Sequence, residues 1–184
     1  MRSGRAGLAI AKMVPGVNSY PRALGIDPGT ARTGYGLIDE TEQGIVAVAY
    51  GVLTTPADWP IPRRMQSLHH QLQELVALHS PSTAAVEKLF FQKNVRTAMS
   101  VGEARGVALL ALAEAGLEVG EYSPREVKQA VAGYGAADKR QIQEMVRLLL
   151  GLAERPEPDD AADALAIAIC HLHSYRLLQI TGGR

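Results

Sequence analysis

The sequence predicts an α/β fold in which one mixed sheet carries helices on its faces. Short apolar segments suited to strands alternate with longer segments whose apolar residues recur at helical spacing. The order is three strands, a helix, a strand, a helix, a strand and then helices. With 184 residues, 47% of them hydrophobic, the chain is long enough for one domain with a substantial core.

The first half of the chain supplies four of the five expected strands. The first three follow one another closely, so short turns and antiparallel pairing are expected. A long amphipathic helix comes next and ends near Ser80, and the fourth strand is short, buried and followed at once by Glu87. We expect these elements at residues 23–27, 33–38, 45–53, 61–79 and 83–86.

The second half supplies one strand and four helices. Ser123 followed by Pro124 is a combination typical of a helix start. The last helix is apolar almost all round, which predicts that it is buried. We expect helices over 95–113, from 124 onward, over 142–149 and over 160–175, and a strand over 117–121.

Small residues recur every four positions in the helix expected over 95–113. Ala98, Gly102 and Gly106 form a smooth stripe that allows another element to approach closely. The stripe is a candidate contact between two copies of the chain, and packing against the chain's own sheet is the alternative.

Charge and cysteine content exclude several classes of protein. Nineteen Lys and Arg balance 19 Asp and Glu, which excludes a strongly basic tail-type nucleic-acid binder and an acidic disordered chain. One cysteine excludes a disulfide framework and a cysteine-based zinc site. No apolar run reaches the ~18 residues of a membrane span, and a reducing cytosolic compartment is the simplest interpretation. We expect residues 1–22 to be a disordered basic extension and 177–184 a flexible tail around a folded domain at 23–176.

Four carboxylates stand where such a sheet would bring them together. Asp27 and Glu87 end the first and fourth strands, and sites in open α/β sheets form outside those ends. Asp160 and Asp163 are three residues apart on the last helix, so they share a face. Clustered carboxylates need compensation, and hard oxygen ligands favour Mg²⁺ or Mn²⁺ over Zn²⁺. Two such ions would suit the in-line displacement of a phosphoryl group.

Each acid also has a purely structural interpretation. Asp27 followed by Pro and Gly is compatible with the start of a turn, and Glu87 with a solvated strand end. Asp160 is equally compatible with an N-cap, with Asp163 at the third position of a capping arrangement. The constellation is more specific than any of its members, because all four acids flank apolar segments.

Five segments, in order and at matching separations, resemble the RuvC family, the bacterial Holliday junction resolvases. They are LGIDPGTARTGYGLI at 24–38, VEKLFFQKN at 86–94, ARGVALLA at 104–111, PREVKQAVAGYGAADKRQIQEMV at 124–146 and DDAADALAIAICH at 159–171. The resemblance covers residues 23–175 and implies an RNase H-like (retroviral integrase superfamily) nuclease domain built on a mixed five-stranded sheet. It also implies a homodimer that makes paired symmetric nicks in four-way DNA junctions.

The resemblance assigns roles to individual residues. Asp27, Glu87, Asp160 and Asp163 match the family's ligands for two Mg²⁺ ions, with Mn²⁺ as a substitute, and Asp27 matches the bridging aspartate. Lys128 and Lys139 match basic residues close to the scissile phosphate. Phe90 matches an aromatic residue that wedges against junction bases, and the adjacent Phe91 duplicates it. The resemblance further implies a bacterial, cytoplasmic protein that works with the RuvA–RuvB branch-migration complex.

Basic and aromatic residues around the acids are candidates for DNA contact. Phosphate contacts position DNA, and a ring stacked on an unpaired base adds ~1–3 kcal/mol. Core packing is the alternative for the two phenylalanines, and a solvated helix face is the alternative for the basic residues. The candidates are Phe90, Phe91, Lys93, Arg96, Arg105 and Arg140, with Lys88 beside them.

Three other functions remain open at this stage. An actin-like or sugar-kinase-like ATP-binding protein also has an Asp-x-Gly-Thr loop after a strand, as at Asp27–Thr30, but it needs two such lobes. Another RNase H-like nuclease would share the metal chemistry, although the EKLFFQKN and VKQAVAGYG segments favour the junction enzyme. A non-catalytic DNA-binding module is disfavoured by the four intact acids.

Overall fold

A five-stranded sheet lies between two layers of helices in the part of the chain that the structure describes. The structure is a computed structural model that describes the backbone of residues 21–89 and 95–181 and the side chains of residues 21–89 and 98–175. The strands are β1 (Arg22–Asp27), β2 (Arg32–Thr41), β3 (Gly44–Thr54), β4 (Thr83–Glu87) and β5 (Val119–Tyr122). The helices are α1 (Ile61–His79), α2 (Val95–Glu114), α3 (Pro124–Ala132), α4 (Lys139–Leu149) and α5 (Asp159–Thr181).

The pairing of the strands brings the two strand-end acids side by side. The sheet order is β3-β2-β1-β4-β5; β1 and β3 both pair antiparallel with β2, whereas β1–β4 and β4–β5 are parallel. Ile26 is opposite Val86 in the β1–β4 register, so the residues that follow, Asp27 and Glu87, end neighbouring strands at the same edge. The mixed five-stranded sheet expected from the sequence is therefore observed.

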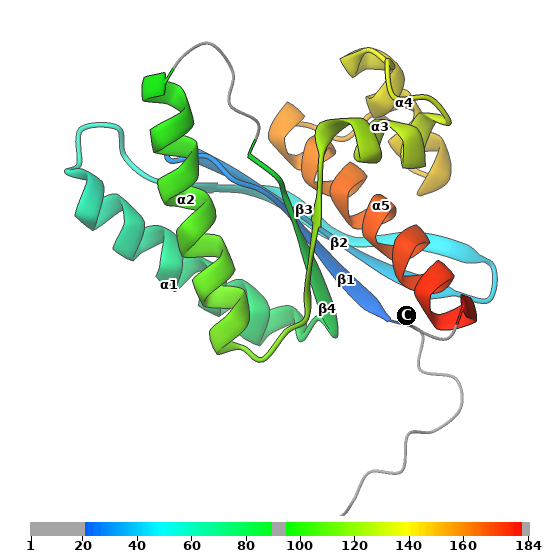
Figure 1. The fold of residues 1–184 in the computed structure, drawn as a ribbon, viewed down its shortest axis with the longest axis horizontal. Helices are drawn as coiled ribbons and strands as arrows, with labels where there is room; N and C mark the ends of the chain where they lie inside the picture. Colours follow the sequence, from blue (N-terminus) through cyan, green and yellow to red (C-terminus); the bar gives the residue numbers. More distant parts are fainter. Residues whose placement is uncertain (1–20, 90–94, 182–184) are drawn as a thin grey trace, which may run out of the picture.

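The alternation along β1 determines which face of the sheet each side chain serves. Leu24 and Ile26 belong to the core under α1 and α2, whereas Ala23 belongs to the core under α5 (Figure 1). Because successive strand residues point to opposite faces, Asp27 shares the α5 face with Ala23 and Gly25. Figure 1 shows α1 and α2 on one side of the sheet and α3, α4 and α5 on the other.

Helix α5 lies directly on β1 and β2 because glycines line the surface of the sheet beneath it. A Cβ on Gly25 would come within 2.2 Å of the Ala164 carbonyl oxygen, and a Cβ on Gly34 within 1.9 Å of the Asp160 carbonyl oxygen. Only a residue without a side chain fits under the helix backbone at such separations. This close packing brings the first turn of α5, which carries two of the acids, to the end of the sheet where β1 terminates.

Two short helices with strong N-terminal caps flank this edge. Ser123 caps α3 in a capping box with Glu126, as the Ser-Pro signal predicted. Asp138 caps α4 in a second capping box, with Gln141 as its partner. These caps determine where α3 and α4 begin, and so where each helix presents its basic residues.

The ends of the described chain differ slightly from expectation. Arg22 already belongs to β1, and α5 continues as a helix to Thr181, through most of the segment expected as a tail from residue 177. Among the described helices, none is both long and apolar enough to cross a bilayer.

Candidate active site

Three of the four acids line one pocket together with two lysines. Asp27 from β1, Glu87 from β4 and Asp163 from α5 meet there at the edge of the sheet. Lys128 from α3 and Lys139 from α4 complete the set, and the pocket measures about 250 Å³. We call this the acid pocket. Five residues that the sequence analysis placed in one site are thus brought together from five different elements.

Burial and mutual repulsion make the acid pocket unfavourable for uncompensated negative charge. Burial, and then the charges of Glu87, Asp163 and Asp160, raise the pKa of Asp27 to about 8, and Lys139 offsets part of this shift. Burial, followed by the charge of Asp163, raises the pKa of Glu87 to about 7. Burial also raises the pKa of Asp163. Carboxyl groups whose pKa values are raised in this way are typical of functional sites that bind a cation or exchange protons.

Two cationic side chains compensate the acids on α5. The Nε of Arg32 donates to Oδ2 of Asp160 at 2.8 Å. The Nζ of Lys139 lies 3.0 Å from Oδ2 of Asp159 and 3.3 Å from Oδ2 of Asp163. Although burial alone would lower it, these two carboxylates leave the pKa of Lys139 raised, so the ammonium form is favoured.

The capping interpretation of Asp160 is wrong. Helix α5 begins one residue earlier, at Asp159, and the backbone N–H of Ala161 donates to the Pro158 carbonyl at 2.9 Å. Asp160 is therefore inside the first turn, where its carboxylate is bound by Arg32.

The donor chemistry of the site fits a hard divalent cation. Among the described residues, no three His, Cys, Asp or Glu side chains converge closely enough to hold a metal ion as they stand. Asp160 and Asp163 are instead held by Arg32 and Lys139, which supply the compensating charge. The four acids offer only carboxylate oxygens, the donors that Mg²⁺ and Mn²⁺ prefer.

Arg105 of α2 supports the acid pocket from behind β4. Its Nε donates to the backbone carbonyl of Glu87 at 3.2 Å, and its guanidinium forms an ion pair with Glu121 of β5. The sequence analysis proposed Arg105 as a DNA contact, whereas the structure engages its guanidinium within the chain. A second link joins α2 to the loop after Asp27, where the hydroxyls of Thr30 and Ser100 lie 2.6 Å apart.

The other candidate DNA contacts are only partly described. Phe90, Phe91 and Lys93 lie outside the described residues, and Arg96 lies in α2 without a described side chain. Arg140 is exposed in the first turn of α4, next to Lys139.

The stripe of small residues on α2 does not pack tightly on the chain's own sheet. A Cβ on Gly106 would meet nothing within 4 Å, and one on Gly102 would meet only Leu89, at an ordinary 3.4 Å. Met99 and Leu110, three and four residues from these glycines, are 66% and 53% exposed. The outward side of α2 is therefore open and carries two exposed apolar side chains, together with the exposed carboxylate of Glu103 between Met99 and Gly106.

Arg32 is the site residue that the sequence analysis missed. It begins β2, five residues after Asp27, and nothing in its immediate neighbours distinguishes it from a solvated strand end. Its role follows from its contact with Asp160, which lies 128 positions away in the chain.

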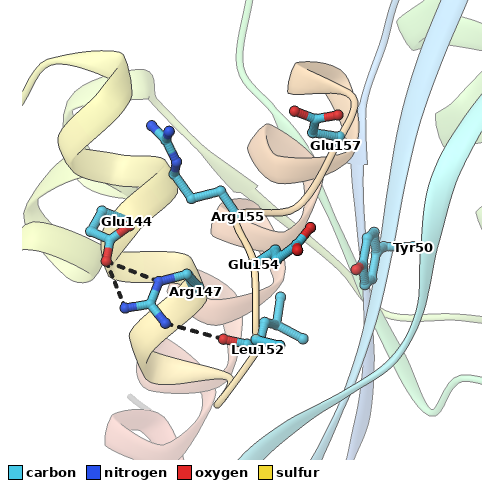
Figure 2. Close-up of a pocket in the computed structure, with 8 residues that line it drawn as sticks. Tyr50, Glu144, Arg147, Leu152, Glu154, Arg155 and Glu157 are labelled. Carbon is cyan, nitrogen blue, oxygen red and sulfur yellow. Dashed lines mark hydrogen bonds and ion pairs between the residues drawn. The ribbon is translucent and has the colours of Figure 1, made fainter.

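A larger groove of about 770 Å³ lies elsewhere, between β3 and the segment that joins α4 to α5. Figure 2 shows Tyr50 on one side of it and the Glu144–Arg147 pair on the other, with Arg147 also bonded to the Leu152 carbonyl. This groove shares no lining residue with the acid pocket. Arg147 is therefore an ion-paired arginine that lies away from the four acids and can serve as a control for variants of the site.

Comparison with known proteins points in one direction. The family model for crossover junction endodeoxyribonuclease RuvC matches residues 23–171. The protein of that name from Chloroflexus aurantiacus is 60% identical over 161 residues, which cover 88% of this chain and 98% of that protein. Thermus thermophilus RuvC, solved in complex with a Holliday junction substrate, is similar with a TM-score of 0.81 at 37% identity, over 86% of this chain and 96% of that one.

A more distant neighbour shares the fold. The yeast mitochondrial Holliday junction resolvase Ydc2 has a TM-score of 0.60 at 17% identity, over 87% of this chain and 83% of that one. Together with the sheet order, these likenesses confirm the RNase H-like fold class predicted from the sequence.

Proposed function

Because the chain belongs to the RuvC family of crossover junction endodeoxyribonucleases, we propose that its acid pocket cuts the phosphodiester bonds of four-way DNA junctions. The chain is a nuclease that resolves Holliday junctions, and membership of the family removes the ATP-binding and non-catalytic alternatives. The observation that carries the assignment of the site is the convergence of Asp27, Glu87 and Asp163 with two lysines in one pocket.

The four acids hold the divalent cations in this proposal. Asp27, Glu87, Asp160 and Asp163 would hold two Mg²⁺ ions, with Mn²⁺ as a substitute, and Asp27 would be the ligand that both ions share. The bridging role is supported by the position of Asp27, whose carboxyl group feels the charges of all three other acids. When bound, such ions would activate a water molecule and stabilise the charge that develops on the phosphate. In this proposal the water oxygen bonds to phosphorus and the P–O3′ bond breaks, which leaves 5′-phosphate and 3′-hydroxyl ends.

The two lysines of the acid pocket bind and orient the scissile phosphate. The ammonium group of Lys139 pairs with Asp163, which lines the pocket, and with Asp159, which does not, so it is kept next to the acids. Lys128 faces the same pocket from α3. Their positive charge compensates the phosphate as it approaches a cluster of carboxylates that would otherwise repel it.

Paired cutting requires two sites, and we propose that two copies of the chain associate through α2. The open Gly106 surface and the exposed Met99 and Leu110 support this contact. A twofold dimer matches the twofold arrangement of strands in a four-way junction. On the resemblance to the RuvC family, we further propose that the chain acts in the bacterial cytoplasm together with the RuvA–RuvB branch-migration complex.

The decisive experiment is metal-dependent nicking of a synthetic four-way junction beside a linear duplex. We expect Asp27→Asn to abolish cleavage while junction binding persists, because the change removes a ligand charge and no DNA contact. Asp58→Asn, an exposed acid in the loop before α1, is the matched control and should cleave normally. Cleavage by Asp27→Asn near the native rate would overturn the assignment of the site.

A further inference from the structure

Arg32 is positioned to compete with a divalent cation for one of the four acids. Its Nε lies 2.8 Å from Oδ2 of Asp160, and their side chains are 51% and 33% exposed, so the pair sits at the rim of the site. Asp160 is also the one acid of the four that does not line the acid pocket. The guanidinium therefore holds its carboxylate outside the pocket that the other three acids share.

The backbone of Asp160 is fixed, so only its side chain is free to change partner. Gly34 lies so close beneath it that a Cβ on Gly34 would come within 1.9 Å of the Asp160 carbonyl oxygen. Asp160 nevertheless remains near enough to the pocket for its charge to act on Asp27 and Asp163. A rotation of the side chain away from Arg32, without movement of α5, is thus the available route by which Asp160 would join the other acids.

We propose that Arg32 is a positioning residue that holds Asp160 in the cation-free protein, yields it to the divalent cation, and is then free to bind a backbone phosphate of the DNA. The inference rests on the proposed function, since it takes the four acids as the cation ligands. It adds an exchange of partners. The carboxylate of Asp160 leaves Arg32 and binds the metal ion, and the guanidinium of Arg32 then binds a DNA phosphate in place of Asp160. Both partnerships suit the chemistry of arginine, which pairs with carboxylates and phosphates alike.

The exchange keeps the charge of the site balanced at each stage. Before the cation binds, Arg32 and Lys139 compensate the acids of α5. After it binds, the cation takes over part of this compensation, and an arginine left beside it would be repelled. A DNA phosphate at the rim gives that arginine a new partner, so cation binding and DNA binding should favour one another through Arg32.

The first test measures Mn²⁺ binding without DNA, by electron paramagnetic resonance and calorimetry, at low ionic strength. We expect Arg32→Gln to bind Mn²⁺ about twofold to fivefold more tightly than the unaltered chain, because an exposed ion pair of ordinary strength no longer competes. Arg32→Lys, which keeps the charge, should bind like the unaltered chain. Arg147→Gln, which breaks the Glu144 pair in the other groove (Figure 2), is the matched control and should leave Mn²⁺ affinity unchanged.

The second test measures binding of a synthetic four-way junction in Ca²⁺ across a series of salt concentrations. Arg32→Gln should reduce the slope of log affinity against log salt by about one, the change expected for one lost phosphate contact, and Arg32→Lys should restore it. Unchanged or weaker Mn²⁺ binding by Arg32→Gln would overturn the competition, and an unchanged slope would overturn the phosphate contact.

Failure of the inference is distinguishable from failure of the proposed function. If the acids are not cation ligands, Asp27→Asn will bind Mn²⁺ as well as the unaltered chain does, which contradicts the proposed function directly. If Asp27→Asn loses Mn²⁺ binding but Arg32→Gln does not alter it, the metal site stands and only the role of Arg32 is wrong.

Discussion

Gly34 of β2 lies directly beneath Asp160 of α5, with room for a hydrogen atom but not for a methyl group. A Cβ at residue 34 would stand 1.9 Å from the Asp160 carbonyl oxygen and 2.5 Å from its carbonyl carbon. This contact sets the depth at which the first turn of α5 rests on the sheet. The position of an acid on the last helix therefore depends on the absence of a side chain on the second strand.

The Gly34 contact predicts that Gly34→Ala will destabilise the fold and disturb the site together. We expect a loss of about 1–3 kcal/mol in the free energy of unfolding, since the helix must shift to admit the methyl group. Gly36→Ala, which would press on Leu165 one turn along, should destabilise by a similar amount but weaken Mn²⁺ binding less. Urea unfolding and Mn²⁺ titration check this, and a Gly34→Ala variant as stable as the unaltered chain would contradict it.

Arg105 is predicted to act on cleavage by positioning Glu87. Arg105→Gln should slow junction cleavage about tenfold, the size typical for loss of a group that orients a metal ligand, while junction affinity changes little. Glu121→Gln removes the ion pair but leaves the bond from Arg105 to the Glu87 carbonyl, so it should cost less. Single-turnover rates and binding in Ca²⁺ separate the two effects. Loss of affinity without loss of rate would instead support the DNA contact expected from the sequence.

Phe90 is predicted to favour the junction over the linear duplex. It is three residues beyond Glu87, so its reach is tied to the acid pocket. Because stacking on an unpaired base is worth ~1–3 kcal/mol, Phe90→Ala should slow junction cleavage by about tenfold or more and leave folding and Mn²⁺ binding intact. Phe91→Ala should matter less. If Phe90→Ala cleaves normally and Phe91→Ala cleaves slowly, Phe91 has the role proposed for Phe90. If both variants cleave normally, neither ring acts as a wedge against the junction bases.

The outward side of α2 is predicted to join two copies of the chain. Leu110→Glu replaces an exposed apolar side chain of that side with a second carboxylate beside Glu103 and should convert the dimer to a monomer in light scattering. Its cuts on the two strands of a junction should then become independent of each other. Leu78→Glu is the matched control, because Leu78 on α1 is 76% exposed and outside the proposed contact. A dimer that survives Leu110→Glu would place the interface elsewhere.

His171 is predicted to limit stability in acid. Its two ring nitrogens lie 2.7 Å from the Thr83 hydroxyl and 2.9 Å from the Tyr122 hydroxyl, and burial lowers the pKa of His171 from 6.5 to about 4. Between pH 6.5 and about pH 4, the unfolded chain therefore binds a proton at His171 that the folded chain does not bind. The contribution of His171 to stability should therefore fall by about 3 kcal/mol as the pH drops from about 6.5 to 4. The raised pKa values of Asp27 and Glu87 act in the opposite direction over the same range, because the folded chain binds their protons more readily than the unfolded chain does.

The check is a series of urea unfolding curves over that pH range. Between pH 6.5 and 4, the stability of His171→Gln should change by about 3 kcal/mol more favourably on acidification than that of the unaltered chain, even if the variant is less stable at neutral pH. His70→Gln, an exposed histidine on α1, should leave the profile as it is. The same change with pH in His171→Gln as in the unaltered chain would show that His171 does not contribute to the pH dependence.

The sequence by itself determined the elements and the identity of the four acids. Periodicity located the strands and helices because each buries one face, and Asp27 and Glu87 could be placed at one edge because parallel strands bring their carboxyl ends together. The two acids of α5 followed from their spacing of three on a helix. The likeness to the RuvC family then supplied the chemistry that composition and spacing left open.

Only the tertiary structure decided how the acids are compensated and held. Arg32 and Asp160 are 128 positions apart, and Arg105 and Glu87 are 18 apart on different elements. Such pairs depend on how α5 and α2 pack on the sheet. For α5, the approach is set by glycines of β1 and β2 and not by any local pattern. A half-exposed arginine looks the same in sequence whether it faces solvent or an acid. Its partner exists only once two distant segments have packed together, and that is why Arg32 became visible only in the folded chain.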